Sequence, residues 1–231
     1  MSGTRGTQTT STPRTPSRGR IDKRQAILGA AFTVFARRGY ARACMEEIAE
    51  VAGVAKHTVY NHLGDKENVF RSAMETAADD VMDRNLAVVD LFAAEDAAGA
   101  PEDDLTARLE ALAHRLLLRC CDERSWALKR LLHAELARFP ELLEVVRGRR
   151  ASRLTDALAD RLARLALSGR LRPCDPAEAA EHFLALLTGP LETRSRLGTR
   201  AVPDEELRRV AHAAVRTFLL AYGPAPHGGG A

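Results

Sequence analysis

Apolar residues recur every three or four positions along most of this chain, which is the spacing of one buried face of an α-helix. In the first such segment Ile27, Ala31 and Phe35 share one side, which predicts a helix over residues 22–38 that Gly39 ends. Longer helices are predicted over residues 66–94, 105–121, 125–139, 140–167, 176–196 and 203–222. The sequence therefore predicts an all-α fold.

Two shorter amphipathic segments meet at Gly53, the first of them beginning near Cys44. Ile48, Ala49 and Ala52 would form the inner face of the first helix, and Gly53 allows the left-handed backbone that ends it. Val59 would lie on the buried side of the second helix. This layout is that of a helix-turn-helix, whose second helix enters the DNA major groove, although an ordinary helical hairpin has a similar pattern.

The residues around this turn decide between the two interpretations. The segment FTVFARRGYARACMEEIAEVAGVAKHTVYNHLGDKENVF resembles the N-terminal DNA-binding domain of the TetR family of transcriptional regulators, and the match runs without a gap from Ile27 to about Phe70. The resemblance implies a three-helix DNA-binding domain followed by a larger helical domain for ligand binding and dimerisation. It also implies a homodimer on a palindromic DNA operator, most often as a repressor.

The same resemblance assigns roles to individual residues. Tyr60 and Lys66 are expected to contact phosphates, and the rest of the exposed face of the second helix is expected to meet base edges or nearby phosphates. The predicted DNA-binding residues are Lys56, His57, Thr58, Tyr60, Asn61, His62 and Lys66. Ala43, Cys44 and Ala55 depart from the family, which usually has Ser or Thr there, so three polar contacts are expected to be missing.

The composition divides the chain into four parts. Residues 1–20 are a Ser, Thr, Pro and Arg-rich tail that is expected to be disordered, residues 21–66 are the predicted DNA-binding domain, residues 67–222 the regulatory and dimerisation domain, and residues 223–231 a flexible tail. Residues 1–70 hold 11 Lys and Arg against 6 Asp and Glu, whereas the rest of the chain holds 23 against 25. Positive charge thus gathers where phosphate binding requires it.

The second half resembles one C-terminal subtype of the same family more loosely, through Phe-Pro-Glu-Leu at 139–142 and AAEHFLALLTGPL near residues 179–191. In this family the last two long helices build a four-helix dimer interface. The apolar residues that would supply it are Ala179, Phe183, Leu186, Leu187, Val210, Ala214 and Phe218. These faces could instead pack only within the chain.

The family also places a ligand cavity among the middle helices. Convergent polar or aromatic groups there are His114, Trp126, Arg130 and His133, among many Leu and Ala residues. Such a lining suits a small lipophilic effector, which would release the operator by binding one conformation better than the other. The alternative is a closed body that senses nothing.

Other classes of protein find less support in the sequence. The four cysteines form no zinc or CxxC spacing, and Glu110/His114 and Glu178/His182 lack the Glu-x-x-His spacing of carboxylate-bridged metal sites. We therefore expect no catalytic residue, metal or cofactor, and no enzyme activity. A sequence-tolerant architectural DNA protein remains open, and so does, less favoured, a helical-bundle enzyme. No apolar run approaches the ~20 residues of a membrane span, which predicts a cytoplasmic protein without membrane contact.

Overall fold

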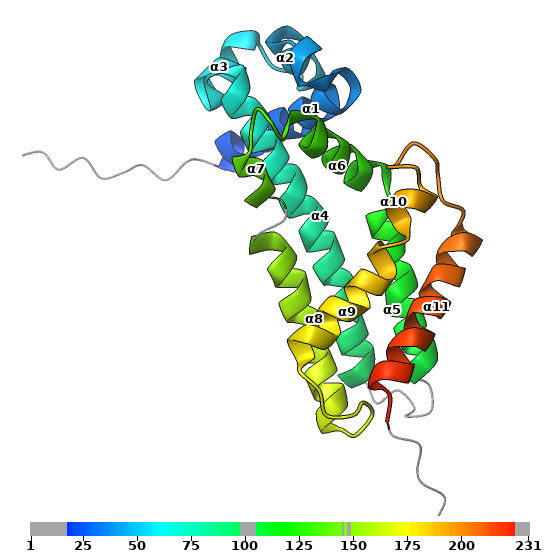
Figure 1. Ribbon diagram of the computed structural model, residues 1–231. Helices are drawn as coiled ribbons and strands as arrows, with labels where there is room; N and C mark the ends of the chain where they lie inside the picture. The colour runs from blue at the N-terminus through cyan, green and yellow to red at the C-terminus, as the bar shows by residue number, and fades with distance from the viewer. Residues whose placement is uncertain (1–17, 98–104, 145, 147–148, 225–231) are drawn as a thin grey trace, which may run out of the picture.

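The computed structural model describes residues 18–97, 105–144, 146 and 149–224, and the regular secondary structure in these ranges is helical throughout. The first three helices form a small unit at one end of the molecule (Figure 1). They are α1 (Arg18–Arg42), α2 (Met45–Val51) and α3 (Lys56–Leu63). The long helix α4 (Lys66–Ala97) leaves this unit and runs the length of the second, larger bundle.

The larger bundle surrounds the lower part of α4. Its helices are α5 (Leu105–Cys120), α6 (Glu123–Glu135), α7 (Glu141–Leu143), α8 (Arg149–Leu167), α9 (Pro176–Thr188), α10 (Leu191–Arg194) and α11 (Asp204–Tyr222). Helix α5 packs along α11, α8 packs along α9, and both pairs contact α4 or each other (Figure 1). Among the described helices, none has the length and apolar character that crossing a bilayer would demand.

The ends of the predicted helices differ from the observed ones in several places. Helix α1 begins at Arg18, one turn earlier than predicted, and is interrupted at Gly39, which adopts φ 75° and ψ 162°. Asp65 caps α4, because its Oδ1 accepts a hydrogen bond from the N–H of Asn68 at 2.8 Å. Helix α6 begins at Glu123, where Asp122 provides the cap, and ends at Glu135, four residues before the predicted end.

Two predictions of continuous helices are wrong. The predicted helix over residues 176–196 ends at Thr188 because Pro190 has no N–H to continue the hydrogen-bond ladder after Gly189. The predicted helix over residues 140–167 is divided into α7 and α8. Leu142 of α7 is buried in the core of the first unit and Leu158 of α8 in the core of the second. Each of these two helices therefore contributes to a different core.

The buried side chains form two cores, and α6 contributes to both. The first core contains Phe35, Ile48 and Phe70 from the N-terminal unit together with Leu128 and Leu131 of α6. The second core contains Leu109, Leu158, Phe183 and Phe218 of the bundle together with Trp126 of α6. The first core also takes in side chains of α4 as far as Ala78, so the first turns of α4 pack with the N-terminal unit. The predicted division of the chain at residue 66 remains a prediction.

An aromatic cluster joins the N-terminal unit to the turn that follows α6. The Tyr40 and Phe139 rings lie 5.1 Å apart and the Phe70 and Phe139 rings 5.0 Å apart, measured between centroids. Arg71 Nε lies 2.7 Å from Glu141 Oε1 on the edge of this cluster. Because buried aromatic pairs contribute about 0.5–1.5 kcal/mol beyond their area, this contact holds the two parts of the chain firmly together.

Candidate nucleic-acid interface

The turn between α2 and α3 has the geometry that its sequence predicts. Gly53 lies at φ 64°, in the left-handed region that favours glycine. The N–H of Gly53 donates to the carbonyl of Glu50 at 3.0 Å, and the N–H of Val54 donates to that of Ala49 at 3.0 Å. These bonds satisfy the last carbonyls of α2 and set the direction in which α3 leaves the turn.

Helix α3 is buried on one side only. Its Val59 side chain is fully buried, and Ile48 and Ala49 of α2 lie in the same core. On the other side, Lys56, His57, Tyr60 and Asn61 are exposed, whereas Thr58 and His62 are half-buried. A short helix that carries exposed polar side chains and is held by an apolar back is the arrangement that reads base edges in a major groove.

The N-caps of α2 and α3 lack side-chain hydrogen bonds, as the departures from the family pattern predict. Cys44 caps α2 and Ala55 caps α3 in extended conformations, and neither side chain accepts a bond from a helix N–H. Relative to Ser or Thr, such caps cost about 0.5–2 kcal/mol each. The hydroxyl groups that would touch phosphates in relatives are absent here.

Lys56 is already paired in the protein alone. Its ammonium group forms an ion pair with the Glu46 carboxylate of α2 and lies 5.8 Å from the centroid of the Tyr60 ring. The hydrogen bond from Lys56 lowers the pKa of Glu46, and the same bond raises the pKa of Lys56. Both side chains are more than half exposed, so the pair is weak, and a DNA phosphate would compete with Glu46 for Lys56.

Lys66 has a structural role beside its predicted role in DNA binding. Its Nζ donates to the carbonyl oxygen of Ala41 at 3.1 Å and lies 4.7 Å from the centroid of the Tyr40 ring. A lysine in the first turn of a helix opposes the helix dipole. Its bond to the end of α1 gives that charge a partner and ties the start of α4 to the N-terminal unit.

The four predicted effector contacts have different surroundings in the described structure, and their role in effector binding stays a prediction. Arg130 Nη1 donates to the carbonyl of Gly198 at 2.9 Å, and Trp126 packs against the same glycine. His133 is exposed on α6. His114 lies on α5, where its Nε2 is 2.6 Å from Asp204 Oδ1 of α11. Helix α6 is packed between two cores, so its polar side faces the segment before α11 or solvent.

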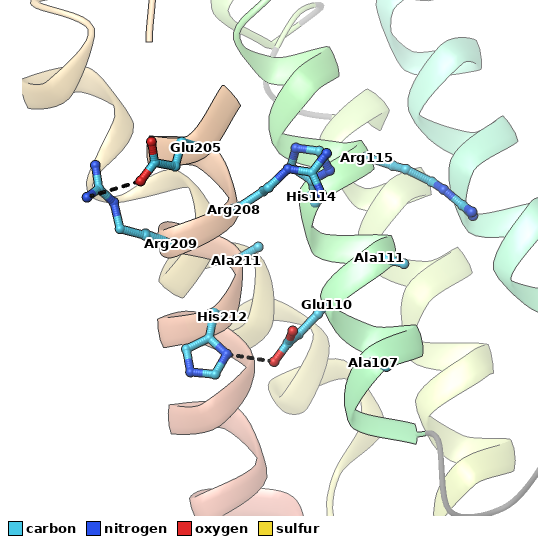
Figure 2. Close-up of a pocket in the computed structure, with 10 residues that line it drawn as sticks. All are labelled: Ala107, Glu110, Ala111, His114, Arg115, Glu205, Arg208, Arg209, Ala211 and His212. Atoms are coloured by element: carbon cyan, nitrogen blue, oxygen red, sulfur yellow. Dashed lines mark hydrogen bonds and ion pairs between the residues drawn. The ribbon is translucent and has the colours of Figure 1, made fainter. Parts of the chain in front are cut away.

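His114 instead borders an open groove between α5 and α11, of about 580 Å³ (Figure 2). Alanines and charged side chains line this groove. Figure 2 shows the second histidine pair across it, in which His212 Nδ1 lies 2.8 Å from Glu110 Oε1. Each of the two pairs joins a histidine to a carboxylate on the facing helix, so imidazole contacts join α5 to α11 at both ends of the groove.

A more enclosed, apolar cavity of about 230 Å³ lies elsewhere, between α4, α5, α8 and α9. The described residues that line it are Met82, Leu116, Leu117, Cys120, Val146, Leu154, Thr155, Leu184, Leu187 and Thr188. No signal in the sequence marks this cavity, because Leu, Met and Thr at helical spacing also form ordinary cores. Burial raises the pKa of the Cys120 thiol on its wall, so this cysteine is a packing group rather than a nucleophile.

Most of the predicted dimer residues lie inside the single chain. Ala179, Phe183, Leu187, Val210, Ala214 and Phe218 are at most 5% exposed within the single chain, so they leave almost no surface for a partner. They fill the second core because α9 and α11 pack against α5 and α8 as well as against each other. Only Leu186 of the predicted set is half-buried. It borders two shallow grooves between α9 and α11, of about 320 and 350 Å³.

Two family models match the chain. The model for bacterial regulatory proteins of the tetR family matches residues 27–73, which contain the helix-turn-helix. The model for the C-terminal domain of AefR-like transcriptional repressors matches residues 107–224, which is half of the chain. The first match lies within the first core, and the second match contributes residues to both cores.

Individual relatives agree with these models. The crystal structure of a TetR-family transcriptional regulator from Mesorhizobium loti is 32% identical, covers 90% of this chain and 100% of that chain, and superposes with a TM-score of 0.79. The flavonoid-responsive regulator FrrA is 28% identical over 89% of this chain and 100% of its own, with a TM-score of 0.66. The HTH-type regulator YfiR of Bacillus subtilis is 42% identical over 60 residues, which are 26% of this chain and 29% of YfiR.

Proposed function

Because this chain belongs to the TetR family of DNA-binding transcriptional regulators, we propose that it is a repressor that a small lipophilic molecule releases from a palindromic operator. The observation that carries the proposal is the polar, exposed face of α3, which a left-handed glycine and a fully apolar back hold in one orientation. The match to a C-terminal domain of repressors supports repression rather than activation.

In this proposal the DNA contacts divide into two kinds. Tyr60 and Lys66 bind phosphates, and Lys56, His57, Thr58 and Asn61 meet base edges or nearby phosphates, with His62 at the far end of the helix. The exposure of Tyr60, Lys56 and Asn61 supports this division. Lys66 is held against Ala41, so its charge stands at a fixed place beside α3.

The second copy of the chain is proposed to cover the α9–α11 face. TetR-family regulators bind their operators as dimers, since two helix-turn-helix units on successive major grooves gain affinity together. Here the surface available for that contact is Leu186 and the shallow grooves beside it, which Ala185, Ala213, Thr217 and Ala221 also line. Small side chains at these positions let two helices of a partner approach closely.

The effector is proposed to bind in the apolar cavity between α4, α5, α8 and α9. Its volume of about 230 Å³ exceeds the roughly 150 Å³ that holds benzene in an engineered apolar cavity, so a two-ring molecule is a reasonable guest. FrrA responds to flavonoids, which are aromatic molecules of this general kind. Met82 of α4 lines the cavity, and α4 begins at Lys66 beside α3, so a guest can act on α4 directly.

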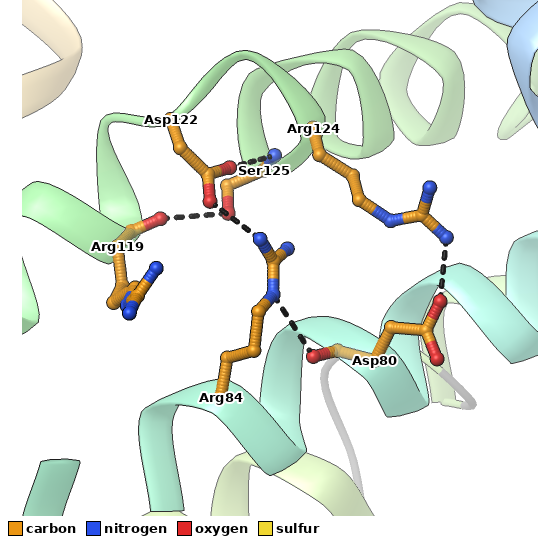
Figure 3. A network of polar contacts seen from close by, with 6 residues as sticks. All are labelled: Asp80, Arg84, Arg119, Asp122, Arg124 and Ser125. Carbon is orange, nitrogen blue, oxygen red and sulfur yellow. Dashed lines mark hydrogen bonds and ion pairs between the residues drawn. The ribbon is translucent and has the colours of Figure 1, made fainter. Parts of the chain in front are cut away.

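A polar network connects α4 to α6, which gives a second route from the cavity to the DNA-binding unit (Figure 3). Arg84 Nη1 of α4 lies 2.9 Å from Asp122 Oδ2 at the start of α6, and Arg124 Nη2 of α6 lies 2.6 Å from Asp80 Oδ2 of α4. Arg124 also lies 4.9 Å from the centroid of the Phe32 ring in α1. A shift of α4 would therefore move α6 and α1 together.

The proposal is tested by selecting genomic DNA fragments with the purified protein and footprinting the sites that it retains. We expect a protected palindrome, bound at least about a thousandfold more tightly than unrelated DNA at physiological salt. Similar affinity for all sequences would instead support the sequence-tolerant architectural protein. The selected site then serves to screen neutral aromatic and aliphatic compounds for release of the protein.

A further inference from the structure

Helix α4 passes from the first core to the second within about three turns. Ala78 is its last buried side chain in the first core, and Val88 is its first in the second core. A helix that connects two cores can bend between them, so it does not fix the angle between them by itself. A second contact is needed to hold the DNA-binding unit at one angle on the bundle.

Helix α6 and the turn after it provide this second contact at two places on α1. Near the start of α6, the Arg124 guanidinium lies 4.9 Å from the centroid of the Phe32 ring. After the end of α6, the Phe139 ring lies 5.1 Å from the Tyr40 ring, measured between centroids. Phe32 and Tyr40 stand before and after the interruption of α1 at Gly39. Because the two contacts lie at separate points of α1, they resist a rotation of the DNA-binding unit that one contact would allow.

Arg124 differs from the aromatic contact because a charge directs it. Its Nη2 atom lies 2.6 Å from Asp80 Oδ2, in the part of α4 between the two cores (Figure 3). The start of α6 is itself fixed, since Asp122 accepts hydrogen bonds from the N–H of Ser125 at 2.7 Å and from Arg84 of α4 at 2.9 Å. A guanidinium group can stack on an aromatic ring and bind a carboxylate at the same time. One side chain therefore contacts α1 and α4 where the two cores meet.

We infer that Arg124 is a positioning residue, which sets the angle of the DNA-binding unit on the bundle and so determines the half-site spacing that the protein accepts. In a dimer joined through its bundles, this angle decides how far apart the two α3 helices stand. One extra base pair moves the second half-site by about 3.4 Å and turns it by about 34°, so a small change of angle is measurable as a change of preferred spacing. The inference rests on the proposed dimer on a palindromic operator, and Arg124 is not among the proposed DNA contacts.

The test measures binding of the full-length protein to labelled DNA by fluorescence anisotropy. The DNA set contains the selected operator, the same operator with one base pair added or removed between the half-sites, and a single half-site. In Arg124→Met the ion pair is lost, while an unbranched side chain still covers Phe32. We expect unchanged half-site binding and roughly three- to tenfold weaker operator binding, because the second unit meets its half-site at a lower effective concentration. The preference for the natural spacing should shrink by a similar factor, and Asp80→Asn should act in the same direction.

Arg153→Met is the matched control, since it removes an ion pair of 3.5 Å that joins α8 to Asp83 of α4. It should keep both the operator affinity and the preference for the natural spacing. Arg124→Lys retains a positive charge beside Asp80 and should recover part of that preference. Sedimentation and thermal unfolding check that every variant folds and keeps the oligomeric state of the natural chain.

Three outcomes would speak against the proposals, and they differ in which one they remove. A preference for the natural spacing that stays undiminished in both Arg124→Met and Asp80→Asn would overturn the role of Arg124 and leave the palindromic operator in place. Equal losses on the half-site and on the operator would also overturn that role, since they would assign Arg124 to stability alone. A natural chain that binds every spacing equally would instead contradict the proposed dimer on a palindrome.

Discussion

The Trp126 ring lies directly against Gly198, so that a Cβ atom added to the glycine would stand 2.5 Å from Cδ2 of the indole. Gly198 is the third of three consecutive residues with positive φ, after Arg196 at 50° and Leu197 at 57°. Non-glycine residues adopt this conformation only at a cost, so the surrounding contacts must hold the segment in place. The segment joins α10 to α11 and rests on α6 through Trp126 and Arg130.

Replacing Gly198 tests how tightly this contact is packed. We expect Gly198→Ala to lower the free energy of unfolding by about 2–4 kcal/mol, because the new methyl group meets the indole and the backbone stays left-handed. Gly169→Ala is the matched control, since Gly169 has φ 75° but open space around a Cβ, and it should cost only about 1–2 kcal/mol. Urea unfolding followed by Trp126 emission measures both; equal losses would mean that the indole moves aside freely.

Lys66 supplies the prediction for phosphate binding. We expect Lys66→Ala to weaken binding to operator and unrelated DNA by about the same factor, and to lower the salt slope by about one, because one phosphate contact is lost. Band-shift titrations over a range of salt concentrations measure both quantities. Unchanged affinity and slope would show that Lys66 serves only to hold Ala41 and Tyr40, the partners it has in the free protein.

The ion pair that Lys56 forms leads to a prediction of tighter DNA binding. Glu46→Gln frees the Lys56 ammonium group and removes a negative charge beside α3. Affinity for DNA should rise roughly two- to fivefold, the equivalent of one exposed ion pair. In the Lys56→Met background the gain should shrink, since part of it comes from the freed lysine. An equal gain in both backgrounds would assign the effect to the charge of Glu46 alone.

Features of this molecule that depend on residues close together in the sequence could be predicted. Gly53 and the apolar back of α3 stand within a few residues of each other, so the turn and the exposed side of α3 follow from short-range spacing. The resemblance to the TetR family then supplied the order of the two domains, and the family models agree with it.

Features that depend on distant contacts could not be predicted in the same way. Trp126 meets Gly198 across more than seventy residues, and no local pattern marks either partner. Phe183 and Phe218 have the spacing of an interface, yet each is fully buried inside the chain, because core faces and interface faces use the same apolar residues. The break at Gly189 and Pro190 is different, since the missing N–H of proline is visible in the sequence.

Acid stability should depend on Asp204. A hydrogen bond from Arg208, which has the larger effect, and one from His114 hold the pKa of Asp204 below its usual value of 3.8. Asp204 therefore binds a proton more readily in the unfolded chain than in the folded chain. The stabilisation that its hydrogen bonds provide is present above about pH 4 and is lost as the pH falls through the folded-state pKa. Asp204→Asn should lower the urea midpoint slightly at about pH 5.5 and leave it unchanged at about pH 2.5.

Glu205→Gln provides the comparison for this experiment, because its ion pair with Arg209 spans 3.8 Å and both side chains are more than 70% exposed. We expect it to change the midpoint less than Asp204→Asn at the higher pH. If Asp204→Asn were as stable as the natural chain at both pH values, the contacts that join Asp204 to α5 and to Arg208 would contribute nothing measurable.

Leu186 provides the test of the dimer face. It is the one residue of the predicted interface that stays half-buried in the single chain, and it borders both grooves between α9 and α11. An arginine there would bring its charge into an apolar contact between copies, where it would have to lose its hydration. We expect the natural chain to sediment at about twice its mass of 25.2 kDa at micromolar concentration, and Leu186→Arg to sediment as a monomer. Because one helix-turn-helix then binds without the second one of the dimer, the variant should also lose most of its operator affinity.

Leu167→Arg is the control, since Leu167 is 89% exposed at the end of α8 and borders neither groove. A Leu186→Arg protein that still sediments as a dimer would place the contact between copies on another face of the bundle.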